Sequence, residues 1–347
     1  MIGLYIVVFA LAAWGMSFKR HGFYDALARE TTAAIKGIFI ALVFVSHISG
    51  YVDSLGYSYA SCGGKLFLFL KRLLGQLIVV MFLFYSGYGV MMSARHKGRA
   101  YVAQIPKRRI LTTVLNFDVA VLVFVLAGWL SGMELSWRKI GLSLIGWESV
   151  GNSNWYIFVI VLCYGAAWLS STVMSMKVGD LGGGGALCSI IVLCIGLILS
   201  FVKPVWWYNT IMAFSFGCLY AEYKEKIERR VQQHYRVYCV ATFSLLIVLM
   251  GILKSTTYGG WHNLLAIVFA FSVVIFSMKI KVGNRCLFWM GINLFPLYIY
   301  QRLPMRLCLG WFSPPIGEWQ CAFYVAICIV ATVAVAMAYK KIKITLG

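Results

Sequence analysis

The sequence predicts an all-α fold, a polytopic membrane bundle of about ten or eleven transmembrane helices with no soluble domain. Of the 347 residues, 61% are hydrophobic and only 12% are charged, a balance that a soluble domain of this size does not keep. Apolar stretches long enough to cross a bilayer recur along the chain. Polar connections reach only about 25 residues, which is too short for an independent domain. We therefore expect the function to be located within the membrane bundle.

Eleven apolar stretches are candidate spans. They cover residues 1–17, 34–52, 73–93, 111–131, 154–171, 185–202, 205–221, 237–254, 262–280, 286–303 and 319–338. The first and seventh are short for a hydrocarbon core of about 30 Å, so we expect one of them to be tilted, partly embedded or broken. Residues 1–30 are predicted to form an additional N-terminal span with a cytosolic linker, and residues 31–347 the main helical domain. Because Lys19 and Arg20 follow the first span, we expect it to be retained.

The positive charges indicate how the chain is threaded through the membrane. The net charge is +20, from 31 Lys and Arg against 11 Asp and Glu. A nucleic-acid partner is not expected, because the cations lie in short segments between spans, where topology signals and anionic lipid headgroups are found. The segments assigned to the cytosol are 19–36, 95–109, 172–184, 224–236, 279–285 and 340–343. This assignment predicts a membrane protein with its N-terminus outside and its C-terminus in the cytosol.

Cysteines and glycines give no sign of a cofactor. The ten cysteines lie mostly inside predicted spans, without a CxxC pair or a His/Cys cluster at ligand spacing, so neither a metal site nor a disulfide is expected. The run Gly182–Gly185 lacks the following Lys and Ser or Thr of a phosphate-binding loop, and it is interpreted as a hinge between the fifth and sixth spans.

Lys36 and His47 are the first candidate site residues. Eleven positions separate them, so on a helix they lie on nearly the same face, roughly 16 Å apart along the axis. If Lys36 is at the cytosolic surface, His47 is near the middle of the bilayer, where an ionisable side chain is costly and usually functional. The alternative is a structural histidine that hydrogen-bonds a neighbouring helix. The position therefore makes His47 a functional-site candidate.

A second candidate site is the basic segment before the fourth span, Lys107, Arg108 and Arg109. It is either a topology signal or a site for a phosphate-bearing ligand, since the planar fork of arginine suits phosphate. Asp118, inside the same span, would orient or neutralise such a cation.

Further polar side chains lie near the ends of three spans. Around Gly87 the third span carries hydroxyls that would line a polar cavity, although small residues there also permit close helix packing. Side chains that open the fifth span suit sugar binding or an aromatic belt. Those that end the tenth span follow Pro296, which predicts a bend around a cavity, although they would also snorkel to the interface. The candidates for substrate binding are Ser86, Tyr88, Asn154, Trp155, Gln301 and Arg302.

Taken together, these motifs resemble the integral-membrane acyltransferase type 3 enzymes, which O-acylate cell-surface sugars. The pattern of a basic residue, ten residues and then histidine matches Lys36 and His47. The aromatic Ser-Gly element matches Phe82 to Tyr88, and the basic segment matches Lys107–Arg109. The resemblance covers the chain from about residue 30 and implies acetyl-CoA as the donor, held by the basic segment. It also implies His47 and Lys36 as catalytic residues, with His47 as a general base or as a transient acyl-histidine, and a lipid-linked or surface polysaccharide as the acceptor. Together with the predicted topology, it implies the bacterial inner membrane.

Two positions depart from the family pattern. Many members carry a second arginine where this chain has Thr112, and many have a histidine in the late helix where this chain reads Tyr300-Gln301-Arg302. The second departure leaves His47 as the main candidate for acid-base chemistry.

Two other classes of function remain open. A transporter or flippase of a lipid-linked glycan would use such a bundle without covalent chemistry, but it would often show internal repeats, and the Lys36-to-His47 pattern is not repeated. A glycan polymerase would be expected to have a larger outer loop. Transfer of label from an acyl-CoA to a glycan separates the enzyme from both.

Overall fold

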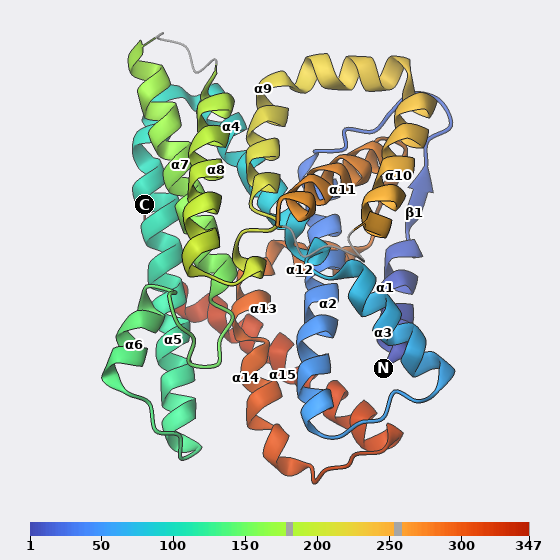
Figure 1. Cartoon of the computed structure of the whole chain (residues 1–347), viewed down its shortest axis with the longest axis vertical. Helices are drawn as coiled ribbons and strands as arrows, with labels where there is room; N and C mark the ends of the chain where they lie inside the picture. The colour runs from blue at the N-terminus through green and yellow to red at the C-terminus, as the bar shows by residue number, and fades with distance from the viewer. Residues whose placement is uncertain (178–182, 253–258, 347) are drawn as a thin grey trace.

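The computed structural model describes residues 1–177, 183–252 and 259–346, and in these ranges it is almost entirely helical (Figure 1). The longer elements are α1 (Ile2–Ala13), α2 (Arg29–Ser54), α3 (Cys62–Leu74), α4 (Leu77–Ile105), α5 (Thr112–Leu130), α7 (Trp155–Lys177), α8 (Gly184–Val202), α9 (Met212–Gln233), α10 (Tyr235–Ile252), α11 (Gly259–Lys279) and α15 (Glu318–Ile342). The shorter ones are η1 (Pro106–Leu111), α6 (Trp137–Leu144), η2 (Val205–Trp207), α12 (Arg285–Ile292), α13 (Leu294–Tyr300), α14 (Arg302–Leu307), η3 (Leu309–Trp311) and the strands β1 (Met16–Phe18) and β2 (Ile280–Val282).

The predicted class, an all-α multi-pass membrane bundle, is confirmed. Among the described residues, seven helical ranges are long and apolar enough to cross a membrane. One of them, Cys62–Leu130, joins α3, α4 and α5, so it contains two of the predicted spans. The predicted spans outside these ranges correspond to α1, to α9 and to the broken series α12–α14.

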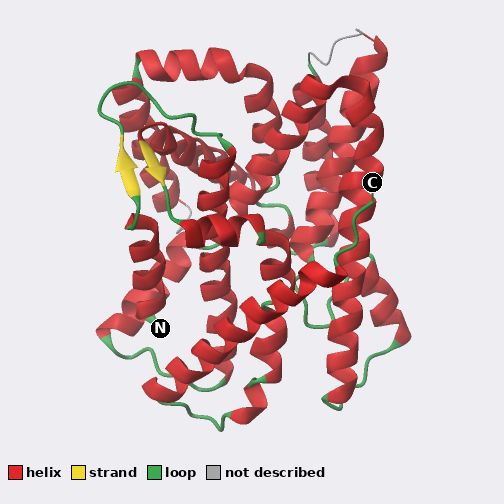
Figure 2. Ribbon diagram, turned by 180° about the vertical axis from the view of Figure 1, so that it is seen from behind, coloured by secondary structure: helices red, strands yellow, loops and turns green. Residues whose placement is uncertain are grey.

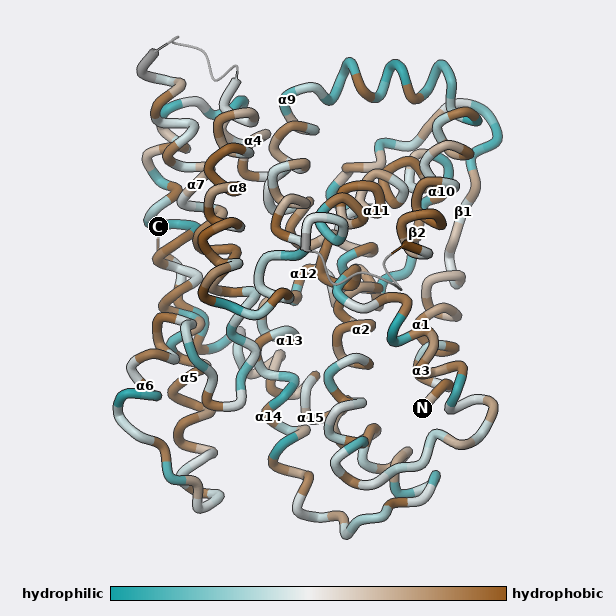
Figure 3. The backbone as a smooth tube through the Cα atoms, viewed as in Figure 1, coloured by the Kyte–Doolittle hydropathy of each residue, from teal (hydrophilic) through white to brown (hydrophobic). Residues whose placement is uncertain are grey.

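The molecule has two polar ends, which Figure 3 shows as teal segments at the limits of mainly brown helices. We call the end with η1 and the second half of α9 the basic end, and the end where α2 and α14 finish the opposite end (Figure 1). The long helix α2 extends from the middle of the bundle to the opposite end, so His47 lies nearer to that end than Lys36 does.

Reciprocal glycines allow two helix pairs to pack with their backbones in contact. A Cβ on Gly87 of α4 would collide with Phe214 O of α9, and a Cβ on Gly217 of α9 would collide with Phe84 O of α4. In the same way α2 packs on α12, because Gly37 leaves no room for a Cβ beside Leu287 O. Small residues permit such close approach in membrane helices. These two contacts fix α2 and α4, which carry most of the candidate site.

The tenth predicted span, 286–303, is not one helix. It is divided into α12, α13 and α14, with breaks at Asn293 and Gln301. Pro296 explains the first break, because its ring nitrogen cannot donate to Ile292 O and its ring crowds that carbonyl. Asn293 instead donates from Nδ2 to Trp289 O at 2.8 Å. The bend expected from Pro296 is therefore present, and after it α13 and α14 pack against α2 and α15.

The first and seventh predicted spans also differ from single full crossings. The helix α1 has only 12 residues, and after Gly15 the chain forms β1, which pairs antiparallel with β2, Ser17 opposite Lys281 (Figure 2). The helix α9 starts at Met212 and bends at Tyr223, beyond which it lies across the basic end (Figure 1). The expectation that short spans would be broken or partly embedded matches these two shapes.

The glycine run between α7 and α8 is partly described. Gly182 lies outside the described residues. The backbone N–H groups of Gly183 and Gly185 donate to the Glu222 carboxylate at 2.5 Å and 2.9 Å. The described part of the run therefore caps α8 against α9, at a helix N-terminus where a carboxylate is stabilising.

Candidate active site

His47 lies in the second half of α2 with one ring nitrogen unused. Its side chain keeps some accessible surface, whereas Nδ1 is fully buried and finds no hydrogen-bond partner in the described ranges. The ring of Tyr298, from α13, has its centroid 6.3 Å from that of His47. A histidine that only linked two helices would use this nitrogen in a hydrogen bond. The open Nδ1 therefore favours a histidine that meets a substrate.

Arg302, the first residue of α14, brings a positive charge to His47. Its guanidinium carbon lies 5.8 Å from the ring centroid of Tyr51, one turn after His47 on α2, and its charge acts on the imidazole. One N–H group donates to Asn152 O at 3.5 Å, but Nε is buried without a partner among the described residues. The neighbouring Gln301 is buried, and its Nε2 donates to Tyr298 O at 3.1 Å.

A series of tyrosine and serine side chains connects the surroundings of His47 with α7 and α4. The rings of Tyr298 and Tyr156 have centroids 5.3 Å apart. The Tyr156 hydroxyl interacts with Ser86 of α4, and the Tyr298 hydroxyl interacts with Ser153. The hydroxyls of Tyr298 and Ser153 make no hydrogen bond of normal geometry with any described residue. Buried hydroxyls left this way cost free energy unless a ligand or water satisfies them.

Lys36 and Arg109 form a cation pair toward the basic end. Arg109 belongs to η1, a π-helical turn that joins α4 to α5. The Arg109 guanidinium lies beside the hydroxyls of Tyr101 and Tyr164, and its charge, like that of Arg29, acts on Lys36. Neither Lys36 nor Arg109 has an ion pair in the part of the chain that the structure describes. Two cations without a carboxylate favour an anionic ligand such as a phosphate.

The basic segment acts on Lys36 through one residue. Lys107, Arg108 and Arg109 are all exposed, but of the three only Arg109 has a charge that acts on Lys36. Asp118, expected to orient or neutralise these cations, is in no ion pair among the described residues, and its Oδ1 is buried without a partner there. The structure therefore brings only Arg109 of the basic segment together with Lys36.

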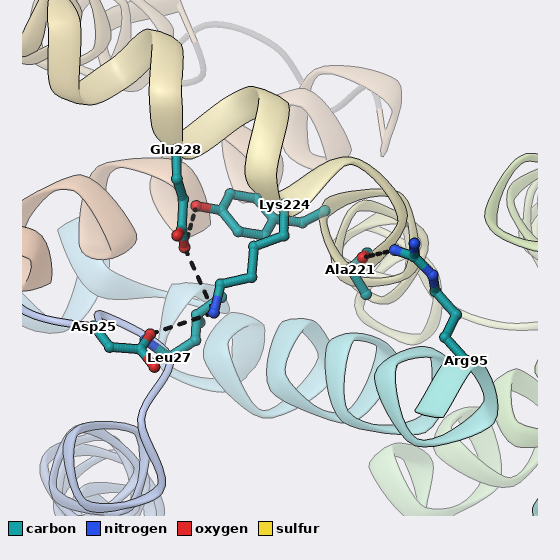
Figure 4. Close-up of polar contacts among 7 residues, drawn as sticks. Asp25, Leu27, Arg95, Ala221, Lys224 and Glu228 are labelled. Carbon is teal, nitrogen blue, oxygen red and sulfur yellow. Dashed lines mark hydrogen bonds and ion pairs between the residues drawn. The ribbon is translucent and has the colours of Figure 1, made fainter. Parts of the chain in front are cut away.

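Tyr88 is placed away from His47, in a polar network at the basic end. It lies beside Lys224 of α9, which makes ion pairs with Asp25 at 3.5 Å and Glu228 at 4.0 Å (Figure 4). Burial by itself would lower the pKa of Lys224, but Tyr88, Glu228 and Asp25 together raise it above its ordinary value. Burial also raises the pKa of Glu228. Tyr88 therefore belongs to the contact between the linker after α1 and the bend of α9.

Asn154 and Trp155 lie at the start of α7. Asn154 donates from Nδ2 to the backbone oxygens of Gly146 and Glu148, each at 2.9 Å, so its amide holds the loop before α7. The Trp155 ring packs edge-on against Tyr156, with centroids 5.9 Å apart. Both side chains are half-buried. They support the loop that carries Asn152 and Ser153.

The comparisons with known proteins identify the family. A family model described as an acyltransferase domain matches residues 33–340, almost the whole chain. The protein belongs to the acyltransferase type 3 family. No curated protein and no solved structure matches it significantly. The chain is thus a multi-pass membrane acyltransferase, in which the polar groups described above lie within or beside the long helices α2, α4 and α7.

Three residues of the candidate site were not singled out by sequence. Tyr164 and Ser153 carry no motif of their own, and Arg306 resembles any interfacial arginine. A partial signal was present, because Tyr156 and Tyr164 are eight residues apart and so lie on one face of α7. No set of three or more His, Cys, Asp or Glu side chains is placed to hold a metal ion within residues 1–177, 183–252 and 259–346.

Proposed function

We propose that this protein transfers an acetyl group from acetyl-CoA to a hydroxyl of a lipid-linked or cell-surface polysaccharide. The observation that carries the proposal is the pair of unneutralised sites on one helix, Lys36 with Arg109 and His47 with Arg302. They lie roughly 16 Å apart along α2. The phosphates of an acyl-CoA lie at the far end of the molecule from its reactive thioester. The spacing of the two sites supports binding of the phosphates at one and of the thioester at the other.

The donor is assigned to the cation pair. Lys36 and Arg109 would bind phosphates of coenzyme A, with Lys107 and Arg108 as further charges at the rim. The long, uncharged pantetheine arm would then reach into the bundle. Tyr164 and Tyr156 lie on one face of α7 and are buried in the bundle. Their rings and hydroxyls would contact the pantetheine arm. The adenine nucleotide would stay at the basic end, where exposed cations are available.

The chemistry is assigned to His47. As a general base, its neutral imidazole would remove the proton from the acceptor hydroxyl while the oxygen attacks the thioester carbonyl. The C–S bond would then break, and the coenzyme A thiolate would take the proton from the imidazolium. The Arg302 charge would stabilise the oxyanion that forms at the carbonyl. An acyl-histidine route, in which His47 attacks first, uses the same residues.

The acceptor is assigned to the opposite end. Arg302, Gln301, Asn154, Trp155 and Ser86 lie on or next to the elements that surround His47. Tyr88 is left out of this assignment, because its position beside Lys224 separates it from them. The protein would reside in the bacterial inner membrane, with its N-terminus outside, its C-terminus cytosolic and its basic end in the cytosol, where acetyl-CoA is made.

The test compares the wild type with His47→Ala, using purified protein and acetyl-CoA labelled in its acetyl group. Binding of the donor by both, with transfer to a lipid-linked glycan fraction by the wild type only, is the expected result. His21→Ala is the matched control, since His21 is exposed in the linker after α1. Transfer by His47→Ala would contradict the role of His47. Absence of both binding and transfer in the wild type would contradict the enzyme and favour a glycan transporter.

A further inference from the structure

Three residues of the loop before α7 each contact one residue of α13 or α14. Ser153 meets Tyr298, Asn152 O accepts a hydrogen bond from Arg302, and Val150 O accepts one from Arg306 at 2.8 Å. The three partners on the helices are spaced by four residues, so they share one face. We call this arrangement, Val150 to Ser153 with Tyr298, Arg302 and Arg306, the donor strip.

The donor strip holds hydrogen-bond donors that nothing satisfies. The buried atoms without a partner among the described residues are Arg302 Nε, Arg306 Nη2, Asn152 Nδ2, Ser153 Oγ and Tyr298 Oη. Asn152 and Ser153 are themselves almost completely buried, at 0% and 3% exposed. A buried donor without a partner costs free energy, so several of them in one place indicate a missing acceptor.

The strip also carries two positive charges that no described carboxylate neutralises. Neither Arg302 nor Arg306 has an ion pair in the described ranges. The acidic residue nearest to the strip in sequence, Glu148, acts on Lys203 instead. Arg302 and Arg306 are partly buried. Removing a guanidinium group from water without a counter-ion is costly, and its planar fork fits the oxygens of a carboxylate or a phosphate.

The position of the strip relates it to the reaction. Arg302 is one turn from Tyr298, whose ring faces His47, and Arg306 is one turn further toward the opposite end. Each turn corresponds to about 5.4 Å. An oxyanion held between Arg302 and Arg306 would therefore lie within about two turns, or about 11 Å, of His47, a distance that one or two sugar residues can span.

We infer that the donor strip is an oxyanion site, and that the acceptor carries a carboxylate or phosphate on the acylated sugar or on the sugar next to it. This inference rests on the proposed function for the identity of its ligand. Gly151, at a φ of +109°, and Gly128 of α5 leave the space that Arg306 occupies, since a Cβ on Gly151 would come within 2.6 Å of its Nη1. The site is thus built from three parts of the chain, α5, the loop before α7, and α13–α14.

The test uses the full chain in a non-ionic detergent without sugar headgroups. Thermal stabilisation is titrated with a disaccharide that contains glucuronate and with the same disaccharide in which glucose replaces the glucuronate. We expect stabilisation by the charged disaccharide only. Its affinity should fall roughly tenfold to a hundredfold in Arg302→Gln and Arg306→Gln, as for the loss of a charge-assisted hydrogen bond. Arg138→Gln is the matched control, because Arg138 is exposed on α6 at the same end.

Two further variants and probes keep the test decisive. Arg302→Lys keeps the charge without the planar fork, and it should retain part of the affinity even if Arg302→Gln folds poorly. Equal stabilisation by the charged and neutral disaccharides, or equal affinities in Arg302→Gln and Arg138→Gln, would overturn the inference. Arginine-dependent stabilisation by phosphatidylglycerol, with none by the charged disaccharide, would overturn it as well and assign the strip to a lipid phosphate.

Transfer of labelled acetyl to the same two disaccharides separates this inference from the proposed function. Equal transfer to both would overturn the oxyanion site and leave the acyltransferase assignment intact. Arginine-dependent binding of the charged disaccharide, with acetyl transfer to no glycan at all, would support the site and contradict the acetyl transfer.

Discussion

The guanidinium carbon of Arg302 lies 5.8 Å from the centroid of the Tyr51 ring, one helical turn beyond His47. A cation over an aromatic face is attracted to the ring, so this contact helps to hold Arg302 beside α2. It also keeps a positive charge close enough to act on His47, which the proposed mechanism would use to stabilise an oxyanion. The contact links Tyr51 of α2 to Arg302, the first residue after the break at Gln301.

Replacement of Arg109 by Gln is expected to weaken donor binding. The KM for acetyl-CoA should rise roughly tenfold to a hundredfold with little change in kcat, because a charge-assisted contact to phosphate is lost equally in the ground and transition states. Steady-state kinetics with labelled acetyl-CoA measures this. Arg229→Gln, an exposed arginine at the same end, is the control, and an equal rise in KM in both variants would contradict the assignment of Arg109.

Replacement of Gly87 by Ala is expected to destabilise the bundle. The new Cβ would meet the backbone oxygen of Phe214, which cannot move aside, and overpacking of this kind costs about 1 to 3 kcal/mol. Gly89→Ala is the matched control, since no described atom lies within 4 Å of a Cβ there. Thermal unfolding in detergent should show a lower Tm for Gly87→Ala alone. The same Tm for both variants would contradict the close contact between α4 and α9.

Replacement of Asn116 by Ala is expected to loosen the C-terminal segment. Asn116 donates to Ile344 O at 2.8 Å and accepts from Ile344 N–H at 3.0 Å and from the Tyr339 hydroxyl at 2.6 Å. Loss of these bonds should cost about 1 to 3 kcal/mol and speed hydrogen exchange at the Ile344 amide. Thr113→Ala, which removes only a bond to Arg109 O within the same helical segment, should leave that amide protected.

Glu228 is expected to make stability depend on pH. Burial raises its pKa, Asp25 adds to the shift and Lys224 opposes it. The folded state therefore binds this proton more tightly than the unfolded state, and the free energy of unfolding should fall as the pH rises from the ordinary glutamate range through the raised pKa. Glu228→Gln should remove this part of the pH dependence. Thermal unfolding at several pH values measures it, with the exposed Glu225→Gln as control; an unchanged slope in Glu228→Gln would contradict the expectation.

Much of the fold could be predicted, because hydrophobic length is a local property. The span expected over 34–52 is contained in α2, and that over 111–131 corresponds to α5. The helix α3 was missed, since Lys65, Lys71 and Arg72 made its segment resemble a polar connection. A bend at Pro296 was expected in the tenth span, but only the packing of α13 and α14 against α2 and α15 shows where the bend directs the chain.

The candidate site was predicted in part. The spacing of Lys36 and His47 places both on one face of α2, because the geometry of a helix follows from residue numbers alone. The roles expected for Tyr88 and Ser86 were drawn from the same short motif, yet the structure separates them, Tyr88 beside Lys224 and Ser86 beside Tyr156. Neighbours in a motif face different helices when they are two residues apart on a helix.

The sequence by itself determined the class of the protein, its family, the approximate positions of its long helices and the Lys36-to-His47 spacing. These depend on composition, on local periodicity and on motifs that are read along the chain. The tertiary structure alone decided that Arg302 meets Asn152, 150 positions earlier, and that Arg109 lies near Lys36. Such contacts depend on how helices cross and where they break, which is set by packing between distant segments and therefore leaves no periodic signal in the sequence.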